Sequence, residues 1–358
     1  MNAAAKNYDG ENKYIRITDI DEASSTYTDK DIVSPDGILT DNYLVNNRDI
    51  LLARTGASTG KSYLYKKTDV KLYFAGFLIR ANVTTHDPYF VFSQLHTHRY
   101  WRWVSIMSAR SGQPGINSQE YSSFPIYITS IEEENKIAKL LSLLDERIAT
   151  QNKIIDKLQS LIKGISNQLL YANNGISVLL GEILIERSER TKENNQHEVL
   201  SSTVKGIFSQ REYFSKDIAS ENNVGYKIIR LHDVVLSPQN LWMGNINYNG
   251  KFDVGIVSPS YKIFSIAEGF DKEYIAATLK THRALYNYML VSEQGASVVR
   301  RNLNMEEFEQ LVFKIPSFDQ QQKIGRTISV LNLRLELANK QKTLYEKEKQ
   351  YLLRQIFI

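Results

Sequence analysis

An internal repeat sets the organisation of this chain of 358 residues. Thr129–Ile148 reads TSIEEENKIAKLLSLLDERI, and 187 residues later Pro316–Leu335 reads PSFDQQQKIGRTISVLNLRL. Upstream, LHTHR at 95–99 matches LKTHR at 279–283, and RDILLA at 48–53 matches HDVVLS at 232–237, both at an offset of 184. Self-similarity at a fixed period signals repeated structural units. The sequence therefore predicts a globular part and a helix, followed by a second globular part and a second helix, related as a pseudo-twofold pair.

The first repeated segment opens a long apolar stripe. Apolar side chains alternate at spacings of four and three from Ile137 to Leu169, and Gln151 is the one polar residue among them. This spacing is a heptad seam. A helix from about 131 to 171 would be roughly 60 Å long. Ser130 with Glu133, and Ser317 with Gln320, match the capping box that starts a helix.

The second copy continues the same phase to the C-terminus, with Lys342 and Lys349 inside its seam. Because the two helices belong to related halves, we expect them to pair with each other, antiparallel. The alternative is that each helix packs only on its own globular part. The expected pairing residues are Ile137, Leu141, Leu144, Ile148, Ile155, Leu158, Ile162, Ile324, Ile328, Leu331 and Leu335.

The remaining sequence mixes short apolar runs with amphipathic stretches, which is typical of α+β domains. We expect a first globular domain at 1–130 that is short at its N-terminal side, a long helix at 131–175, a second globular domain at 176–316 and a second long helix at 317–358.

The composition excludes several classes of protein. The chain has no cysteine, which excludes a disulfide scaffold and thiolate chemistry, and no apolar run approaches the 18 residues of a membrane span. These features predict a cytoplasmic protein. The net charge is only +4, but residues 48–110 carry 10 basic and 3 acidic side chains. A basic segment of this kind favours a nucleic-acid partner, and a mixed solvated surface is the alternative.

Three motifs suggest catalysis or metal binding, and each is better explained otherwise. The string GASTGKS at 56–62 has three residues between its glycines, whereas a phosphate-binding loop has four and leads into a helix. His96 and His98 lie two apart, so on a helix they point in different directions and cannot easily share a metal. We expect a structural role for His98-Arg99, which recurs as His282-Arg283, and a basic outer face for the residues around it. Asp87-Pro88-Tyr89 resembles part of an adenine-methyltransferase motif but fits a helix start.

Base-reading and phosphate-binding residue types gather in turn-rich segments of both halves. Arg, Lys, Asn and Gln read base edges through paired hydrogen bonds and also bind phosphates. We expect DNA contacts from Arg54, Thr55, Lys61, Arg110, Gln113, Gln239, Asn240, Trp242, Asn245, Arg300, Arg301 and Asn302. No catalytic residue and no metal ligand is predicted.

These strings resemble the DNA specificity subunit of type I restriction-modification enzymes over essentially the whole chain. The resemblance rests on 49–56 with Gly60-Lys61, on 111–117, on the approach to the helix at 125–144, and on 240–244 and 313–324. It implies two target-recognition domains that each read half of a bipartite, gapped site in double-stranded DNA, with the paired helices fixing the gap.

The resemblance also implies the partners. Two modification subunits that bind S-adenosylmethionine and methylate adenine would join the helices, and restriction subunits that use ATP and Mg²⁺ would complete the enzyme. This chain would carry no cofactor and no catalytic activity. Two other functions stay open: a coiled-coil protein-interaction scaffold, and a nucleotide-dependent enzyme built around Lys61.

Two departures from the family pattern stand out. The first half has no counterpart to Leu179–Ile183, so we expect an incomplete or rearranged first edge strand, through truncation or a naturally short variant. The second half has no counterpart to the glycine-rich turn at 56–60, so residue roles do not transfer simply between halves.

Overall fold

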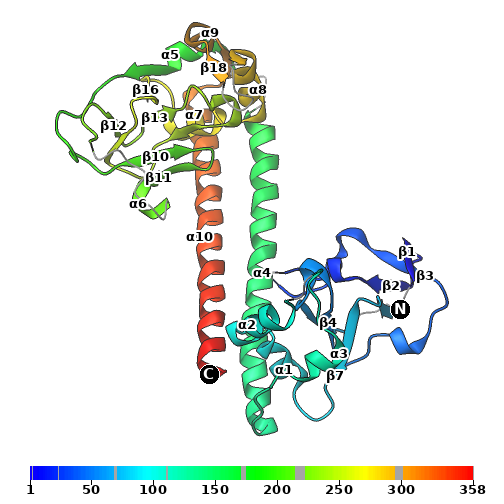
Figure 1. Cartoon of the computed structure of the whole chain (residues 1–358). Coiled ribbons are helices and arrows are strands. Elements are labelled where there is room, and N and C mark those ends of the chain that lie inside the picture. The colour runs from blue at the N-terminus through cyan, green and yellow to red at the C-terminus, as the bar shows by residue number, and fades with distance from the viewer. Residues whose placement is uncertain are drawn as a thin grey trace. The chain divides into compact units, whose positions relative to one another are not determined.

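The computed structural model describes residues 1, 3–22, 24–67, 71–109, 112–170, 175–213, 222–294 and 301–357. They form two compact units: Met1–Lys153 with Asn339–Ile358, and Ile154–Ala338. Each unit contains one globular part together with portions of both long helices, α4 (Ile131–Leu170) and α10 (Phe318–Ile356). Figure 1 labels both helices. Among the described residues, no helix combines the length and the apolar character needed to cross a bilayer.

The globular part of the first unit consists of small sheets with three short helices. Its strands are β1 (Ala4–Asn7), β2 (Asn12–Ile15), β3 (Val33–Asp36), β4 (Asp49–Ala53), β5 (Ser62–Leu64), β6 (Lys71–Phe74) and β7 (Leu78–Asn82). Its helices are α1 (Pro88–Gln94), α2 (His98–Met107) and α3 (Ser118–Ser122). The central sheet has the antiparallel order β5-β4-β7, β2 pairs with β6 in parallel, and β1 pairs with β3.

The second unit repeats this plan and adds strands. Its strands are β8 (Ile176–Leu179), β9 (Leu184–Arg187), β10 (Leu200–Thr203), β11 (Gly206–Ser209), β12 (Lys227–Arg230), β13 (Val234–Leu236), β14 (Ile246–Tyr248), β15 (Val254–Val257), β16 (Lys262–Ile266), β17 (Ser292–Gln294), β18 (Arg301–Leu303) and β19 (Val312–Ile315). Its helices are α5 (Leu180–Ile183), α6 (Gln210–Tyr213), α7 (Lys272–Thr278), α8 (His282–Leu290) and α9 (Met305–Glu309). The central sheet has the order β14-β13-β16-β9.

The expected incomplete edge is present in the first unit. β7 corresponds to β16, and β16 carries β9 on its far side, whereas among the described residues the three-stranded sheet of the first unit ends at β7.

The central strand of each unit is buried on both faces. In β4, Ile50 and Leu52 join the cluster that packs on α1 and α2, while Leu51 and Ala53 join the cluster that contains β2 and β6. Side chains alternate between faces along a strand, so one strand supplies two cores. β13 follows the same plan, with Val234 and Leu236 in one cluster and Val235 in the other.

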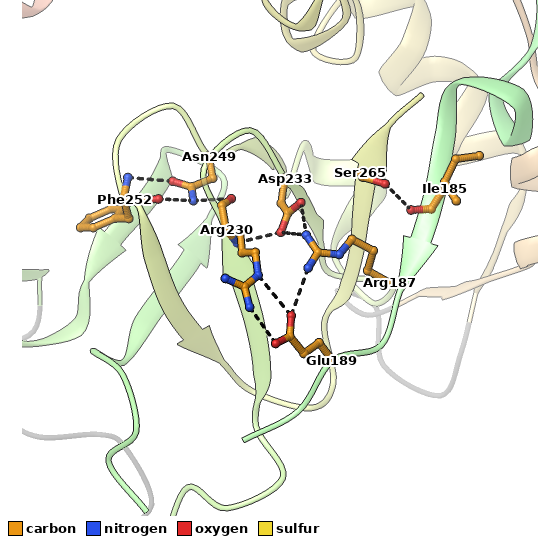
Figure 2. A network of polar contacts seen from close by, with 8 residues as sticks. All are labelled: Ile185, Arg187, Glu189, Arg230, Asp233, Asn249, Phe252 and Ser265. Atoms are coloured by element: carbon orange, nitrogen blue, oxygen red, sulfur yellow. Dashed lines mark hydrogen bonds and ion pairs between the residues drawn. The ribbon is translucent and has the colours of Figure 1, made fainter. Parts of the chain in front are cut away.

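A buried aspartate is the first residue of β4, and another directly precedes β13. Asp49 accepts hydrogen bonds from the Asn46 backbone N–H and from Asn82 Nδ2, each 2.7 Å long. Its counterpart Asp233 accepts from the Arg230 backbone N–H at 2.7 Å and from Arg187 Nη1 at 2.9 Å (Figure 2).

Glu189 lies beside this second aspartate and bonds both arginines, Arg187 at 3.1 Å and Arg230 at 2.8 Å (Figure 2).

The residue before each aspartate has a positive φ, which is 71° at Arg48 and 75° at His232. The two units therefore share an unusual backbone turn that is held by a buried carboxylate.

The predicted seam is the buried stripe of α4. Leu141, Leu144, Gln151 and Ile155 are buried, Ile137, Ile148, Leu158 and Ile162 are partly buried, and most of the residues between them are exposed. On α10, the predicted positions from Ile324 to Ile356 are likewise buried or partly buried, including Leu331 and Leu335.

The antiparallel pairing of the two helices is confirmed within the first unit, at the start of α4 and the end of α10. Leu353 and Phe357 share a cluster with Ala138 and Leu141. Farther along α4 the partners lie earlier on α10: Asp145 Oδ1 accepts from Lys349 Nζ at 2.5 Å, and the Arg147 guanidinium lies over the ring of Tyr345.

A buried polar residue ties the start of each long helix to its globular part. Glu134 is fully buried and accepts from His86 Nδ1 at 2.8 Å and from the Asp87 backbone N–H at 2.9 Å. Its counterpart Gln321 accepts from the Asp271 backbone N–H at 3.0 Å. Asp87 caps α1 as predicted, accepting from the backbone N–H groups of Tyr89 and Phe90.

We predict that Glu134→Ala lowers the free energy of unfolding of the first unit by about 2 kcal/mol, because buried donors lose their acceptor. Denaturant unfolding monitored through the fluorescence of Trp101 and Trp103, in a Trp242→Phe background, measures this free energy. Glu132→Ala changes an exposed carboxylate two residues earlier and should alter stability by less than about 0.5 kcal/mol. Equal effects of the two substitutions would contradict the role given to Glu134.

Candidate nucleic-acid interface

The candidate interface of the first unit is a junction of two loops. One follows β4 and the other precedes α3. The Arg54 carbonyl accepts from the Ile116 backbone N–H at 2.9 Å, Thr55 forms a bridge with Gly115, and the Gly56 N–H donates to the Pro114 carbonyl. Two segments that are about sixty residues apart in the sequence thus form one surface.

Three predicted residues meet at this junction. Arg54 is exposed, and its guanidinium makes no hydrogen bond or ion pair with another described residue. Gln113 is exposed and lies against Gly56, where an added Cβ would be 2.8 Å from Gln113 Nε2. Thr55 is partly buried beside them.

The second unit repeats the junction with different side chains. The Arg301 backbone N–H donates to the Gln239 carbonyl at 3.1 Å, which joins β18 to the loop after β13. The Arg301 guanidinium stacks over the Trp242 ring at 4.9 Å. Gln239 and Asn302 are exposed there, and Asn240 is partly buried.

A glycine in a left-handed conformation closes the first loop in both units. Gly60 has φ +91° and its counterpart Gly244 has φ +94°. At Gly60 an added Cβ would lie 2.7 Å from Val104 Cγ1, so the loop tolerates only glycine. The second unit therefore keeps one glycine of the turn and replaces Gly56 by Asn240, which corrects the expectation that it had no counterpart of this turn.

Buried tyrosines hold this turn of the first unit. Tyr100 Oη donates to the Gly60 carbonyl at 2.8 Å, and Tyr121 Oη accepts from the Gly60 N–H and donates to the Ala53 carbonyl. Burial raises the pKa of Tyr121 to about 12. A 3-10 turn (Gly56–Ser58) and then strand β5 follow Thr55, where a phosphate-binding loop would lead into a helix.

Two predicted contacts lie elsewhere than expected. Asn245 is 5% exposed and bonds Ser202 through both its side-chain oxygen and nitrogen, so it supports β10 from inside the unit and is withdrawn as a base contact. Lys61 pairs with Glu22 at 3.3 Å and its side chain is 17% exposed, so the expected exposed lysine is largely covered. Arg110 and Arg300 lie outside the described residues.

No pattern in the sequence pointed to Phe77. It is 60% exposed, and its carbonyl accepts from the Arg54 backbone N–H at 3.0 Å. It lines a hollow of about 720 Å³ together with Arg16, Arg54 and Thr55. An exposed aromatic ring beside an arginine adds a stacking surface to the junction.

The residue before the threonine cap of α2 or α8 ties that helix to a neighbouring segment in each unit. His96 Nε2 bonds Ser25 Oγ at 2.9 Å, and its counterpart Lys280 bonds Asn247 Oδ1 at 2.6 Å and the Val204 carbonyl. Among the described residues, no three His, Asp or Glu side chains are grouped to hold a metal. The structural role predicted for His98-Arg99 holds for Arg99, which stacks on Phe124 and Tyr127, whereas His98 is exposed.

Together these features define a repeat protein of two related units, each with a junction of polar loops at its surface. Residues 1–160 match the family model of the type I restriction modification DNA specificity domain. The MjaVIII specificity subunit of Methanocaldococcus jannaschii is 30% identical over 131 residues, which cover 35% of this chain and 29% of that protein. The first 160 residues therefore match a type I restriction modification DNA specificity domain, and the chain is similar to type I restriction-modification specificity subunits.

Two broader similarities accompany this match. The putative MjaX specificity subunit of the same organism is 21% identical over 299 residues, covering 77% of this chain and 68% of that protein. The crystal structure of the S subunit from M. genitalium superposes with a TM-score of 0.65 at 14% identity, covering 98% of this chain and 89% of that one, and shares its fold.

Protonation of His96 should make stability depend on pH. Burial, and then the charge of Lys349, lower its pKa from 6.5 to about 4. The unfolded chain therefore binds more protons between these values, and stability should fall as the pH drops from about 6.5 towards 4. Thermal unfolding of the chain and of His96→Gln at pH 7.5 and 5 measures this.

The glutamine variant should lose less stability on acidification than the parent chain. His98→Gln changes an exposed histidine two residues away and should keep the parental pH dependence. If His96→Gln and His98→Gln respond to pH alike, His96 is not the titrating group.

Proposed function

We propose that this chain is the DNA sequence-recognition subunit of a type I restriction-modification enzyme, in which each unit reads one half of a bipartite, gapped site in double-stranded DNA. The observation that carries the proposal is the repeated loop junction. In each unit a backbone hydrogen bond joins the loop after the central strand to a segment about sixty residues later, from the Ile116 N–H to the Arg54 carbonyl in the first and from the Arg301 N–H to the Gln239 carbonyl in the second. The side chains differ, because Arg54 and Thr55 of the first unit correspond to Pro238 and Gln239 of the second. Equal scaffolds with different surface side chains suit two different half-sites.

The side chains at the junctions have the chemistry of base recognition. An arginine donates a bidentate pair of hydrogen bonds to guanine, and glutamine or asparagine pairs with adenine. Arg54 and Gln113 supply these groups in the first unit, and Gln239 and Asn302 in the second, all of them exposed. Arg301, stacked on Trp242, fits a contact that positions the DNA backbone.

The long helices have two roles in this proposal. Their paired faces set the spacing between the half-sites, and their outer faces recruit two modification subunits that bind S-adenosylmethionine and methylate adenine. Restriction subunits using ATP and Mg²⁺ then join, and this chain contributes recognition without catalysis. An apolar stripe supports the second role: Val330, Leu337, Leu344 and Tyr351 of α10 recur every seven residues and are 46, 54, 64 and 63% exposed.

Substitutions at the junctions should relax one half-site at a time. Gln239→Ala should cost about 1–3 kcal/mol of discrimination in the half-site read by the second unit, and Arg54→Ala the same in the other half-site. Sequencing the DNA retained from a random pool by the chain with its modification subunit measures both.

Gln310→Ala is the matched control for Gln239→Ala, because it removes an exposed glutamine at the end of α9. It should leave both half-sites unchanged.

The affinity of the chain for DNA should also fall steeply as the salt concentration rises, because binding releases counterions from the phosphates. Affinity for DNA that is independent of salt and sequence would contradict the proposal and favour a scaffold role.

The outer stripe of α10 has its own test. Leu344→Asp should weaken association with the modification subunit at least tenfold, which corresponds to about 1.4 kcal/mol. Thr343→Asp introduces the same charge at the neighbouring exposed position and should weaken it much less. Analytical ultracentrifugation of the mixed subunits separates these outcomes, and equal losses would exclude a specific role for the stripe.

A further inference from the structure

Arg54 and Phe77 form the pair of residues that directly follows the β4–β7 ladder. The ladder ends with Ala53 opposite Leu78, and the Arg54 backbone N–H then donates to the Phe77 carbonyl at 3.0 Å. Residues directly opposite each other in an antiparallel ladder direct their side chains to the same face, with Cβ atoms about 4.5–5.5 Å apart. The two side chains therefore share one surface, and both residues line the hollow of about 720 Å³.

The pair presents a charged donor and an apolar ring that the described residues leave exposed. The Arg54 guanidinium makes no hydrogen bond or ion pair with another described residue. Arg16, the other arginine at the hollow, is already paired with Asp19 at 2.8 Å and with Asp31 at 3.0 Å. Phe77 is 60% exposed, so burial of its ring against a partner would be favourable.

The second unit has neither member of this pair. The register of β13 with β16, compared with that of β4 with β7, places Pro238 at the position of Arg54. Proline has no N–H, so it cannot donate to the opposite carbonyl. The same register places Ser260 at the position of Phe77. Ser260 is exposed although β9 pairs with the edge of β16, so exposure at this position belongs to the turn and not to an open sheet edge.

The chemistry of the pair fits two neighbouring base pairs in the major groove of DNA. An arginine donates to O6 and N7 of guanine. A phenyl ring has no donor or acceptor, and the C5 methyl group of thymine is the one apolar group that a base edge presents in the major groove. The Cβ separation of about 5 Å suits adjacent base pairs, which lie about 3.4 Å apart along the duplex.

We propose that Phe77 reads the methyl group of a thymine in the base pair next to a guanine that Arg54 contacts. The inference rests on the proposed function, and it adds a specificity-determining residue and the base that this residue selects. Because Pro238 and Ser260 replace the pair in the second unit, this readout belongs to one half-site only.

The test removes the methyl group from the DNA and keeps the base pairing. The chain with its modification subunit first selects its site from a random pool, and the half-site of the first unit is the one that Arg54→Ala relaxes. Each thymine of that half-site is then replaced by uracil, and duplex binding is measured by fluorescence anisotropy. We expect one position, next to the guanine, at which uracil weakens binding about fourfold, the loss expected when one buried methyl group is removed.

Variants of the chain assign this effect to Phe77. Phe77→Ala should bind the thymine and uracil duplexes equally, whereas Phe77→Leu keeps an apolar side chain and should retain most of the preference for thymine. Ile131→Ala is the control, because it shortens an isoleucine that is 48% exposed at the start of α4, and it should leave the preference unchanged. The uracil scan of the parent chain needs no variant, so the test holds if Phe77→Ala fails to fold.

Three results overturn the inference: a half-site with no thymine next to the guanine, equal binding of uracil and thymine at every position, or a uracil penalty that Phe77→Ala leaves unchanged. In each of these cases a gapped motif selected from the pool still supports the proposed function. If the pool yields no motif, the proposed function fails and this inference fails with it.

Discussion

The contact between the end of α10 and the start of α4 is the interaction on which the first unit depends. Leu353 and Phe357 pack on Ala138 and Leu141, and Asp145 binds both Lys349 and the hydroxyl of Tyr89. A lysine in an apolar seam is costly unless it is paired, and Asp145 supplies the partner. The last segment of the chain thus belongs to its first unit, which cannot be excised as a continuous piece of sequence.

The two units share the buried polar contacts that hold each of them together, and they differ in the residues exposed at their surfaces. The buried aspartate, the threonine caps of α2 and α8, and the polar residue that ties the long helix to α1 or α7 recur in both units. The exposed residues at the loop junctions differ. A scaffold fixed by buried hydrogen bonds can change its surface without losing its fold, which is the property that a reader of two different half-sites needs.

Much of the fold follows from local pattern. The 4,3 spacing places the seam because helical periodicity decides which side chains share a face, and the Asp87 cap follows from its position before Pro88. Contacts with distant parts of the chain determine the burial of the residues that the sequence pattern assigned wrongly. Asn245 is polar but buried because Ser202 of a distant strand satisfies it, and Lys61 is covered because Glu22 reaches it. Phe77 carries no periodic signal, so only the assembled junction reveals its exposed ring.

The most direct test of the account is to express the chain with its modification subunit in a host without adenine methylation and to map modified adenines across the genome. The account predicts one motif of two different half-sites separated by a fixed gap, with a methylated adenine in each half. Methylation at an ungapped motif, or no methylation from a stable purified complex, would contradict the claim that two units of one chain read one divided DNA site.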